Sequence, residues 1–219
     1  HWWRLFDDPQ LDRLVDKALL HNTDIRVATA NVRRARALLS EARAGFLPTT
    51  TASAQVQERR FNPAASGIPG AGAFETEFYT LGFDASYEVD LFGRVSRSAE
   101  AAKADFAAAG AALDAARVSI AAETARTYAS MCGFAFQAAS AQETAQLQQK
   151  TLDLTERLLQ GGRGTRRDVD QAVVLVEQAR ANAATFESER RASLYALAVL
   201  TGEPPAAIDP AIANCAALP

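Results

Sequence analysis

The stretch YTLGFDASYEVDLFGR (residues 79–94) decides the fold of this chain, because its side chains alternate between an apolar and a polar face. A period of two predicts a β-strand over residues 78–90. The strand is about as long as one that crosses a bilayer at a tilt, which takes roughly 9–11 residues. The apolar face carries Tyr79, Leu81, Phe83, Ala85, Tyr87 and Val89, and the polar face Thr80, Gly82, Asp84, Ser86, Glu88 and Asp90.

One partner strand precedes this stretch. Residues 49–60 alternate weakly, and residues 61–77 between the two strands are rich in glycine and proline and are expected to form a loop. Because an isolated two-stranded hairpin is marginally stable in water, a soluble sheet is the less favoured interpretation. We therefore predict that residues 48–90 form a β-hairpin with the alternation and length of a membrane-crossing one. Its lipid-facing side chains would be Tyr79, Leu81, Phe83 and Tyr87, and its lumen-facing side chains Asp84, Ser86, Glu88 and Asp90.

Residues 1–47, before the hairpin, are expected to form two helices. Asp8 before Pro9 predicts the start of a short amphipathic helix that ends at His21. A second helix begins at Thr23 or Asp24 and runs to about Phe46, because Pro48 prevents its continuation.

Residues 91–202, after the hairpin, are expected to form a long antiparallel helical hairpin. No proline lies between residues 94 and 160, so one helix of about 100 Å is predicted there. Glycines at 161–164 end it, and Thr165 with Asp168 forms the capping signal of the next helix, which places the tip at 160–168. Residues 203–219 are rich in alanine and proline and are expected to be a linker. The helix at residues 94–160 carries a heptad seam of mostly small residues. Such a seam suits the wall of a tube or a solid helical bundle, and it consists of Ala99, Ala102, Phe106, Ala109, Leu113, Ala116 and Ile120.

The composition excludes some classes of protein. The net charge of -3 lacks the basic excess of nucleic-acid-binding proteins. No run of about 18 apolar residues predicts a transmembrane helix. Cys132 and Cys215 have no metal-site spacing, so two free thiols are the simpler expectation, and a disulfide is the alternative in an oxidising compartment.

No catalytic, cofactor or metal site is predicted. Glu88 and Asp90 share a strand face, but no histidine or cysteine lies near them, and they are expected to face water. His21 stands alone in a turn. The glycines at 161–164 follow a helix, whereas a phosphate-binding loop follows a strand.

Four motifs resemble the first of two repeats of the outer-membrane efflux protein family, which includes TolC, OprM and NodT-like channels. WWRLFDDPQLD at 2–12 is similar to the family's opening, and YEVDLFGR at 87–94 to its strand-to-helix junction. Gly162, Thr165, Asp168 and Val169 have the spacing of its helix-turn-helix tip, and ALAVLTGEP at 196–204 is similar to the end of its fourth helix. The motifs span nearly the whole chain.

The resemblance implies a trimer in which each protomer has two repeats. A twelve-stranded barrel, to which the hairpin at 48–90 would belong, would cross the outer membrane, and an α-barrel of helices would extend into the periplasm of a Gram-negative cell. Since each protomer should supply four strands and this chain supplies two, a second repeat is expected after residue 219. The implied function is that of a passive export conduit for small molecules in a tripartite efflux or secretion system. Its partners would be outer-membrane lipid, a periplasmic adaptor protein and an inner-membrane pump. The alternative is a soluble periplasmic coiled-coil scaffold.

The resemblance also assigns roles to particular residues. The tip residues Gly162, Thr165, Arg166, Arg167 and Asp168 would contact the adaptor or gate the channel. The tip is unusually basic, because Arg163 accompanies Arg166 and Arg167, and the family often has an apolar residue where Arg167 stands. An ordinary helical turn with solvated arginines is the alternative. The strand-to-helix junction would consist of Glu88, Asp90, Leu91, Phe92, Gly93 and Arg94.

Overall fold

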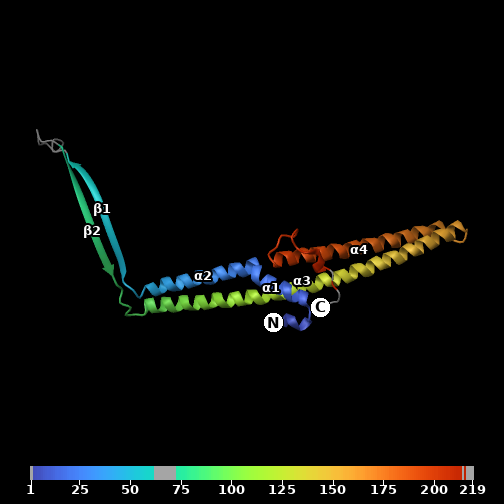
Figure 1. The fold of residues 1–219 in the computed structure, drawn as a ribbon, viewed down its shortest axis with the longest axis horizontal. Helices are drawn as coiled ribbons and strands as arrows, with labels where there is room; N and C mark the ends of the chain where they lie inside the picture. The colour runs from blue at the N-terminus through green and yellow to red at the C-terminus, as the bar shows by residue number, and fades with distance from the viewer. Residues whose placement is uncertain (1, 62–72, 214, 216–219) are drawn as a thin grey trace. The chain divides into compact units, whose positions relative to one another are not determined.

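The fold is mainly helical with one β-hairpin, as predicted (Figure 1). The computed structural model describes residues 2–61, 73–213 and 215, and it divides into two compact units, His1–Val32 with Ala109–Pro219 and Arg33–Ala108. The elements are the 3₁₀ helix η1 (Trp2–Phe6), α1 (Pro9–His21), α2 (Thr23–Ala44), β1 (Thr49–Phe61), β2 (Phe74–Ser86), α3 (Arg94–Gln160), α4 (Arg166–Leu200) and the 3₁₀ helix η3 (Pro210–Ala213).

Local signals account for the helix ends. The Asp8 carboxylate accepts hydrogen bonds from the backbone N–H groups of Gln10 at 2.8 Å and Leu11 at 3.2 Å, so it caps α1 as predicted. Helix α3 has the predicted bounds, and every residue of its predicted seam is half-buried. Helix α2 ends at Ala44, slightly before the predicted Phe46. None of the helices in the described part of the chain is long and apolar enough to cross a membrane.

The second unit contains the hairpin, and its strand bounds differ from the prediction. Strand β2 begins at Phe74 instead of residue 78 and ends at Ser86 instead of residue 90. Its antiparallel pairing with β1 runs from the pair Phe61 and Phe74 to the pair Thr49 and Ser86. Strand β1 starts at Thr49, directly after Pro48, which has no N–H to donate to a neighbouring strand. Residues beyond Ser86 therefore have no β1 residue with which to continue the ladder. Of the predicted loop at 61–77, residues 62–72 lie outside the described part.

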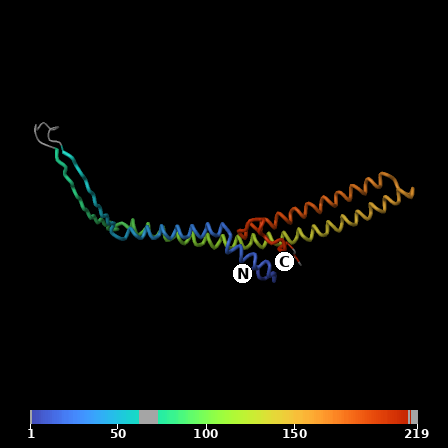
Figure 2. The backbone as a smooth tube through the Cα atoms, turned by 45° about the horizontal axis from the view of Figure 1, so that its top comes forward, coloured from blue at the N-terminus to red at the C-terminus, as the bar shows by residue number. Residues whose placement is uncertain are grey.

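The first unit is held together by a core where α1, α3 and α4 meet. Figure 2 shows α4 running back along the distal half of α3. The side chains of Leu11, Val15, Met131 and Leu197 from these three helices are at most 1% exposed. A second, smaller apolar cluster packs α3 against α4 near the turn that joins these two helices, and it consists of Leu152, Val169, Ala172 and Val176.

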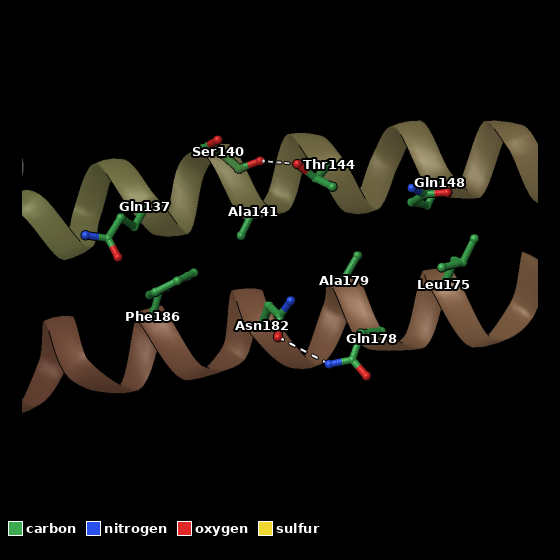
Figure 3. Close-up of a pocket in the computed structure, with 10 residues that line it drawn as sticks. All are labelled: Gln137, Ser140, Ala141, Thr144, Gln148, Leu175, Gln178, Ala179, Asn182 and Phe186. Atoms are coloured by element: carbon green, nitrogen blue, oxygen red, sulfur yellow. Dashed lines mark hydrogen bonds between the residues drawn. The ribbon is translucent and has the colours of Figure 1, made fainter.

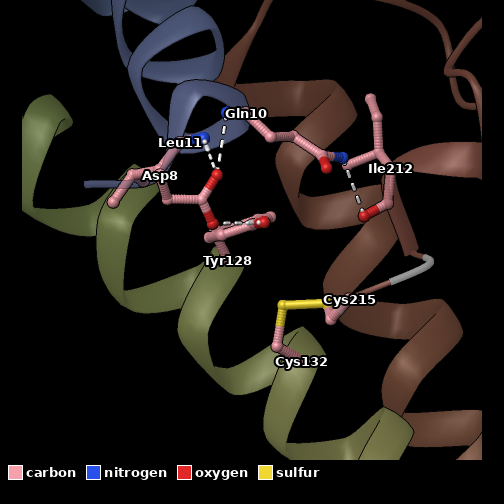
Figure 4. Close-up of a disulfide and its surroundings, with 7 residues drawn as sticks. All are labelled: Asp8, Gln10, Leu11, Tyr128, Cys132, Ile212 and Cys215. Atoms are coloured by element: carbon pink, nitrogen blue, oxygen red, sulfur yellow. Dashed lines mark hydrogen bonds between the residues drawn. A yellow bond between two sulfur atoms is a disulfide. The ribbon is translucent and has the colours of Figure 1, made fainter. Parts of the chain in front are cut away.

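The segment after α4 packs into this core, which its linker-like composition did not suggest, and its role as the connection to a second repeat stays a prediction. Ile208 and Ala213 are buried against the helices, and the Gln10 side-chain amide donates to the Ile212 carbonyl at 3.0 Å. Cys132 of α3 and Cys215 form a disulfide, which corrects the expectation of two free thiols (Figure 4). Packing against the helices removes the apolar side chains of Ile208 and Ile212 from water, which stabilises the docked segment.

Asn22 joins the end of α4 to the start of α2. Its side-chain amide donates to the Leu200 carbonyl at 3.0 Å, and its Oδ1 accepts from the N–H of Asp24 at 2.8 Å. Beside this contact Gly202 has a φ of +72°, and a Cβ there would lie 2.7 Å from the His21 carbonyl oxygen. The C-terminal end of α4 and the N-terminal end of α2 therefore meet at Asn22.

Replacing Asn22 with alanine is expected to lower the free energy of unfolding by roughly 1–3 kcal/mol. The substitution leaves the Leu200 carbonyl and two N–H groups of α2 without their partner in a buried place. Chemical denaturation followed by circular dichroism would measure the loss. The control is Asn31→Ala on the exposed face of α2, which should be neutral or slightly stabilising because alanine is the better helix former. Equal effects at both positions would contradict the role given to Asn22.

Candidate functional site

The tip between α3 and α4 begins with a glycine turn. The N–H of Arg163 donates to the Leu158 carbonyl at 2.8 Å, and the N–H of Gly162 donates to the Leu159 carbonyl at 3.0 Å. Gly162 has a φ of +68°, a conformation that glycine adopts without steric cost. This pair of bonds is a Schellman motif, which satisfies the last carbonyl groups of α3. The predicted role of the glycines in ending the helix is confirmed.

The next turn of the tip is a capping box, as predicted. The Asp168 carboxylate accepts from the Thr165 N–H at 2.9 Å and from the Thr165 hydroxyl at 2.6 Å, and the Asp168 N–H donates to the Thr165 hydroxyl oxygen at 3.3 Å. These bonds, first of all the one from the hydroxyl, lower the pKa of Asp168. Val169 is buried behind the box. The tip backbone is therefore held at both of its ends.

Three arginine side chains project from this frame. Arg163 precedes the capping box, and Arg166 and Arg167 occupy the first turn of α4. All three residues are exposed, and the Arg166 guanidinium lies 3.3 Å from the Asp170 carboxylate. The structure thus brings all five predicted tip residues together in one turn. Their contact with an adaptor, or their action as a gate, stays a prediction.

The junction between the hairpin and α3 uses its carboxylates structurally. Asp90 accepts from the N–H groups of Val95 at 3.2 Å and Ser96 at 2.9 Å and from the Ser96 hydroxyl at 2.6 Å. These bonds, led by the one from the hydroxyl, lower the pKa of Asp90. Glu88 accepts two hydrogen bonds from one edge of the Arg94 guanidinium, from Nε to Oε1 at 2.7 Å and from Nη2 to Oε2. Asp90 therefore caps the start of α3.

These contacts correct part of the sequence interpretation. Glu88 and Asp90 follow the end of β2, so they do not belong to its polar face, and Tyr87 likewise lies beyond the strand. Gly93 provides the sharp turn into α3 with a φ of +78°. Leu91 and Phe92 are 77% and 99% exposed.

The hairpin has one continuous apolar face within its paired part. Leu81 and Phe83 are 85% and 73% exposed. Their partners across the ladder are Ala54 and Ala52, so both strands contribute to the same face. Toward the loop this face becomes charged, a boundary that sequence reasoning missed because the register of β1 was not known. The cross-strand pairs of the apolar face are Ala52 with Phe83, Ala54 with Leu81 and Val56 with Tyr79, followed by the charged pairs Glu58 with Glu77 and Arg60 with Glu75.

A groove with a mixed polar and apolar lining runs between α3 and α4, midway along the helical hairpin (Figure 3). Its volume is about 420 Å³, and side-chain amides and small residues line much of it. The polar residues of α3 at 137, 140, 144 and 148 recur in steps of three and four, which is the signal that could have located it. Within the described ranges, no three histidine, cysteine, aspartate or glutamate side chains are grouped to hold a metal ion. The groove is lined by Gln137, Ser140, Ala141, Thr144, Gln148, Leu175, Gln178, Ala179, Asn182 and Phe186.

A membrane-type β-hairpin that leads into a long helical hairpin is the architecture of outer-membrane channels with a helical periplasmic part. The chain belongs to the outer membrane efflux protein family, whose model matches residues 14–203.

Individual relatives agree with this assignment. The chain is 31% identical over 207 residues to the outer membrane protein OprJ of Pseudomonas aeruginosa, with 94% of this chain and 43% of OprJ covered. It is 30% identical over 207 residues to the probable efflux pump outer membrane protein TtgC of Pseudomonas putida, with 92% and 41% covered. The solved outer-membrane channel OprN matches with a TM-score of 0.81 at 32% identity, over 95% of this chain and 46% of OprN. The chain therefore spans less than half the length of these proteins.

Proposed function

We propose that this chain is the first repeat of an outer-membrane channel that exports small molecules as part of a tripartite efflux or secretion system. The full-length protein would assemble as a trimer. Its strands would cross the outer membrane, and its helices would extend into the periplasm. The names of the relatives, an outer membrane protein and an efflux pump component, support this localisation and function.

The observation that carries the proposal is the exposed apolar face of the hairpin. Val56, Leu81 and Phe83 lie on one face and are between 69% and 85% exposed. Soluble proteins rarely leave such a contiguous apolar surface in water. In a barrel wall the same face would contact lipid, while the opposite face, with Ser53, Gln55 and Thr80, would line the lumen.

Transport through such a channel makes and breaks no bond. We therefore assign the chain no catalytic residue and no cofactor. Selectivity would depend on the width and the lining of the tunnel and on gating at its periplasmic tip. Energy for export would come from an inner-membrane pump, which an adaptor protein would link to the tip at Thr165–Asp168.

Thiol labelling in intact cells tests the membrane crossing. In the full-length protein, Glu75→Cys places a thiol beyond the apolar face at the loop end of the hairpin, and Thr50→Cys places one on the same face at the helical end. A membrane-impermeant maleimide attached to a bulky polymer is the reagent. We expect labelling of the Glu75→Cys variant in intact cells and of the Thr50→Cys variant only after lysis.

The unmodified full-length protein is the background control, and Cys132 and Cys215 of this chain are joined in a disulfide. If neither variant were labelled before lysis and both were labelled after it, the loop would lie inside the cell envelope. That outcome would reject the channel and favour a soluble periplasmic scaffold.

A further inference from the structure

The tip arginines stand where the local electrostatics of the helix disfavour them. Arg166 and Arg167 occupy the first turn of α4, whose free N–H groups give that end a partial positive charge. Acidic side chains are the stabilising choice at such an end. Where a residue type is unfavourable for the local structure and no stabilising contact compensates for it, we expect the residue to serve a function.

Carboxylates of the tip neutralise only part of this charge. Asp168 is engaged by the Thr165 N–H and hydroxyl, and Asp170 forms an ion pair with Arg166. Among the described residues, Arg163 and Arg167 have no ion-pair partner within 4.0 Å, although Asp168 lies near enough to Arg167 for the charge of the arginine to lower its pKa. Two guanidinium groups thus remain available to an outside partner.

The turn that presents these arginines is fixed by hydrogen bonds at both of its ends. The Schellman motif fixes the backbone of Arg163, and the capping box fixes the start of α4. Gly164 packs so closely on α3 that a Cβ there would lie 3.3 Å from the Leu159 nitrogen. Because little backbone freedom is left to lose, binding at this turn carries a small entropic cost. A planar guanidinium presented from such a turn suits bidentate pairing with a carboxylate.

The surface beside the arginines favours a protein partner. Leu158 in the last turn of α3 is 42% exposed, and Val173, about two turns into α4, is 40% exposed. Exposed apolar side chains on two adjacent helices form a surface on which another helical hairpin packs.

We propose that the tip selects an adaptor hairpin whose own turn carries carboxylates, with Arg163 and Arg167 as the residues that determine this specificity. Arg166 contributes less, because Asp170 already pairs with it. This inference rests on the proposed function and adds the chemistry of the partner to it.

Binding of two synthetic hairpins to the purified full-length protein tests the inference. Both are antiparallel coiled coils of one sequence, with two glutamates at the turn of one and two lysines at the turn of the other. We expect the acidic hairpin to bind at least about tenfold more tightly in 50 mM NaCl, as measured by fluorescence anisotropy. The preference should shrink in 500 mM NaCl, because exposed charges are then screened.

Charge reversal provides the matched control. Arg163→Glu combined with Arg167→Glu should invert the preference, whereas Arg117→Glu on the exposed surface of α3 should leave it unchanged. Equal binding of the two hairpins, or no binding of either, would overturn the inference. Binding to phosphatidylglycerol vesicles alone would overturn it in favour of a lipid headgroup. If Glu75→Cys is labelled in intact cells and the hairpins are still not distinguished, the channel stands and only the charge selection fails.

Discussion

Replacing both Cys132 and Cys215 with serine is expected to lower the free energy of unfolding of the helical core by about 4 kcal/mol. The disulfide closes a loop with a sequence separation of 83 residues, and cross-linking so long a loop removes much of the conformational entropy of the unfolded chain. It also attaches the segment with Ile208 and Ala213 to the core, where both are buried. Without the bond this segment is held by packing and by the hydrogen bond from Gln10 to Ile212.

Unfolding titrations with guanidinium chloride, followed by the helical circular dichroism signal, would measure this loss of free energy of unfolding. A reductant should shift the unfolding midpoint of the unmodified protein to that of the double-serine variant and should leave the variant itself unchanged. A variant that unfolds at the same guanidinium concentration as the oxidised protein would show that the bond does not constrain the chain.

A single arginine on the apolar face of the hairpin is expected to reduce membrane insertion strongly. Leu81 lies in the middle of this face and is 85% exposed, so Leu81→Arg would place a charge against the lipid. Charged substitutions near the bilayer midplane of a β-barrel cost about 2–4 kcal/mol. The full-length variant should therefore be depleted from isolated outer membranes by at least tenfold, a change of about 1.4 kcal/mol in free energy, as measured by quantitative immunoblotting.

Thr80→Arg is the matched control, because Thr80 is the neighbouring residue on the opposite face and pairs with Gln55. A lumen-facing arginine remains hydrated, so this variant should reach the outer membrane at nearly the normal level. Equal depletion of both variants would contradict the assignment of the two faces, and depletion of Thr80→Arg alone would reverse it.

Local signals predicted much of this fold. The bounds of α1 and α3 and the capping box at Thr165 were predicted correctly. Each of these features depends on residues only a few positions apart, such as Asp8 with Pro9 or Thr165 with Asp168. The strand period was equally local, so the apolar face of Leu81 and Phe83 could be read from the sequence, whereas the ends of β2 could not. Where β2 ends depends on the start of β1, which lies across the hairpin.

The roles of several side chains depend on distant neighbours. Asp90 and Glu88 suggested a polar strand face, but the turn at Gly93 brings them to the start of α3, where they bind its backbone and Arg94. The arginines of the tip were visible in the sequence, whereas their pairing was decided by the geometry of the turn.

From the amino-acid order alone follow the helices, the caps of α1 and α4 and the two faces of the hairpin, because their causes act within a turn of helix or between alternate residues of a strand. Only the tertiary structure decided that Cys132 meets Cys215, that Asn22 meets Leu200, and that the segment after α4 packs into the core. These contacts join residues far apart in the chain. No local signal encodes such a contact, because it exists only when separate helices pack and exclude water from the apolar surface between them.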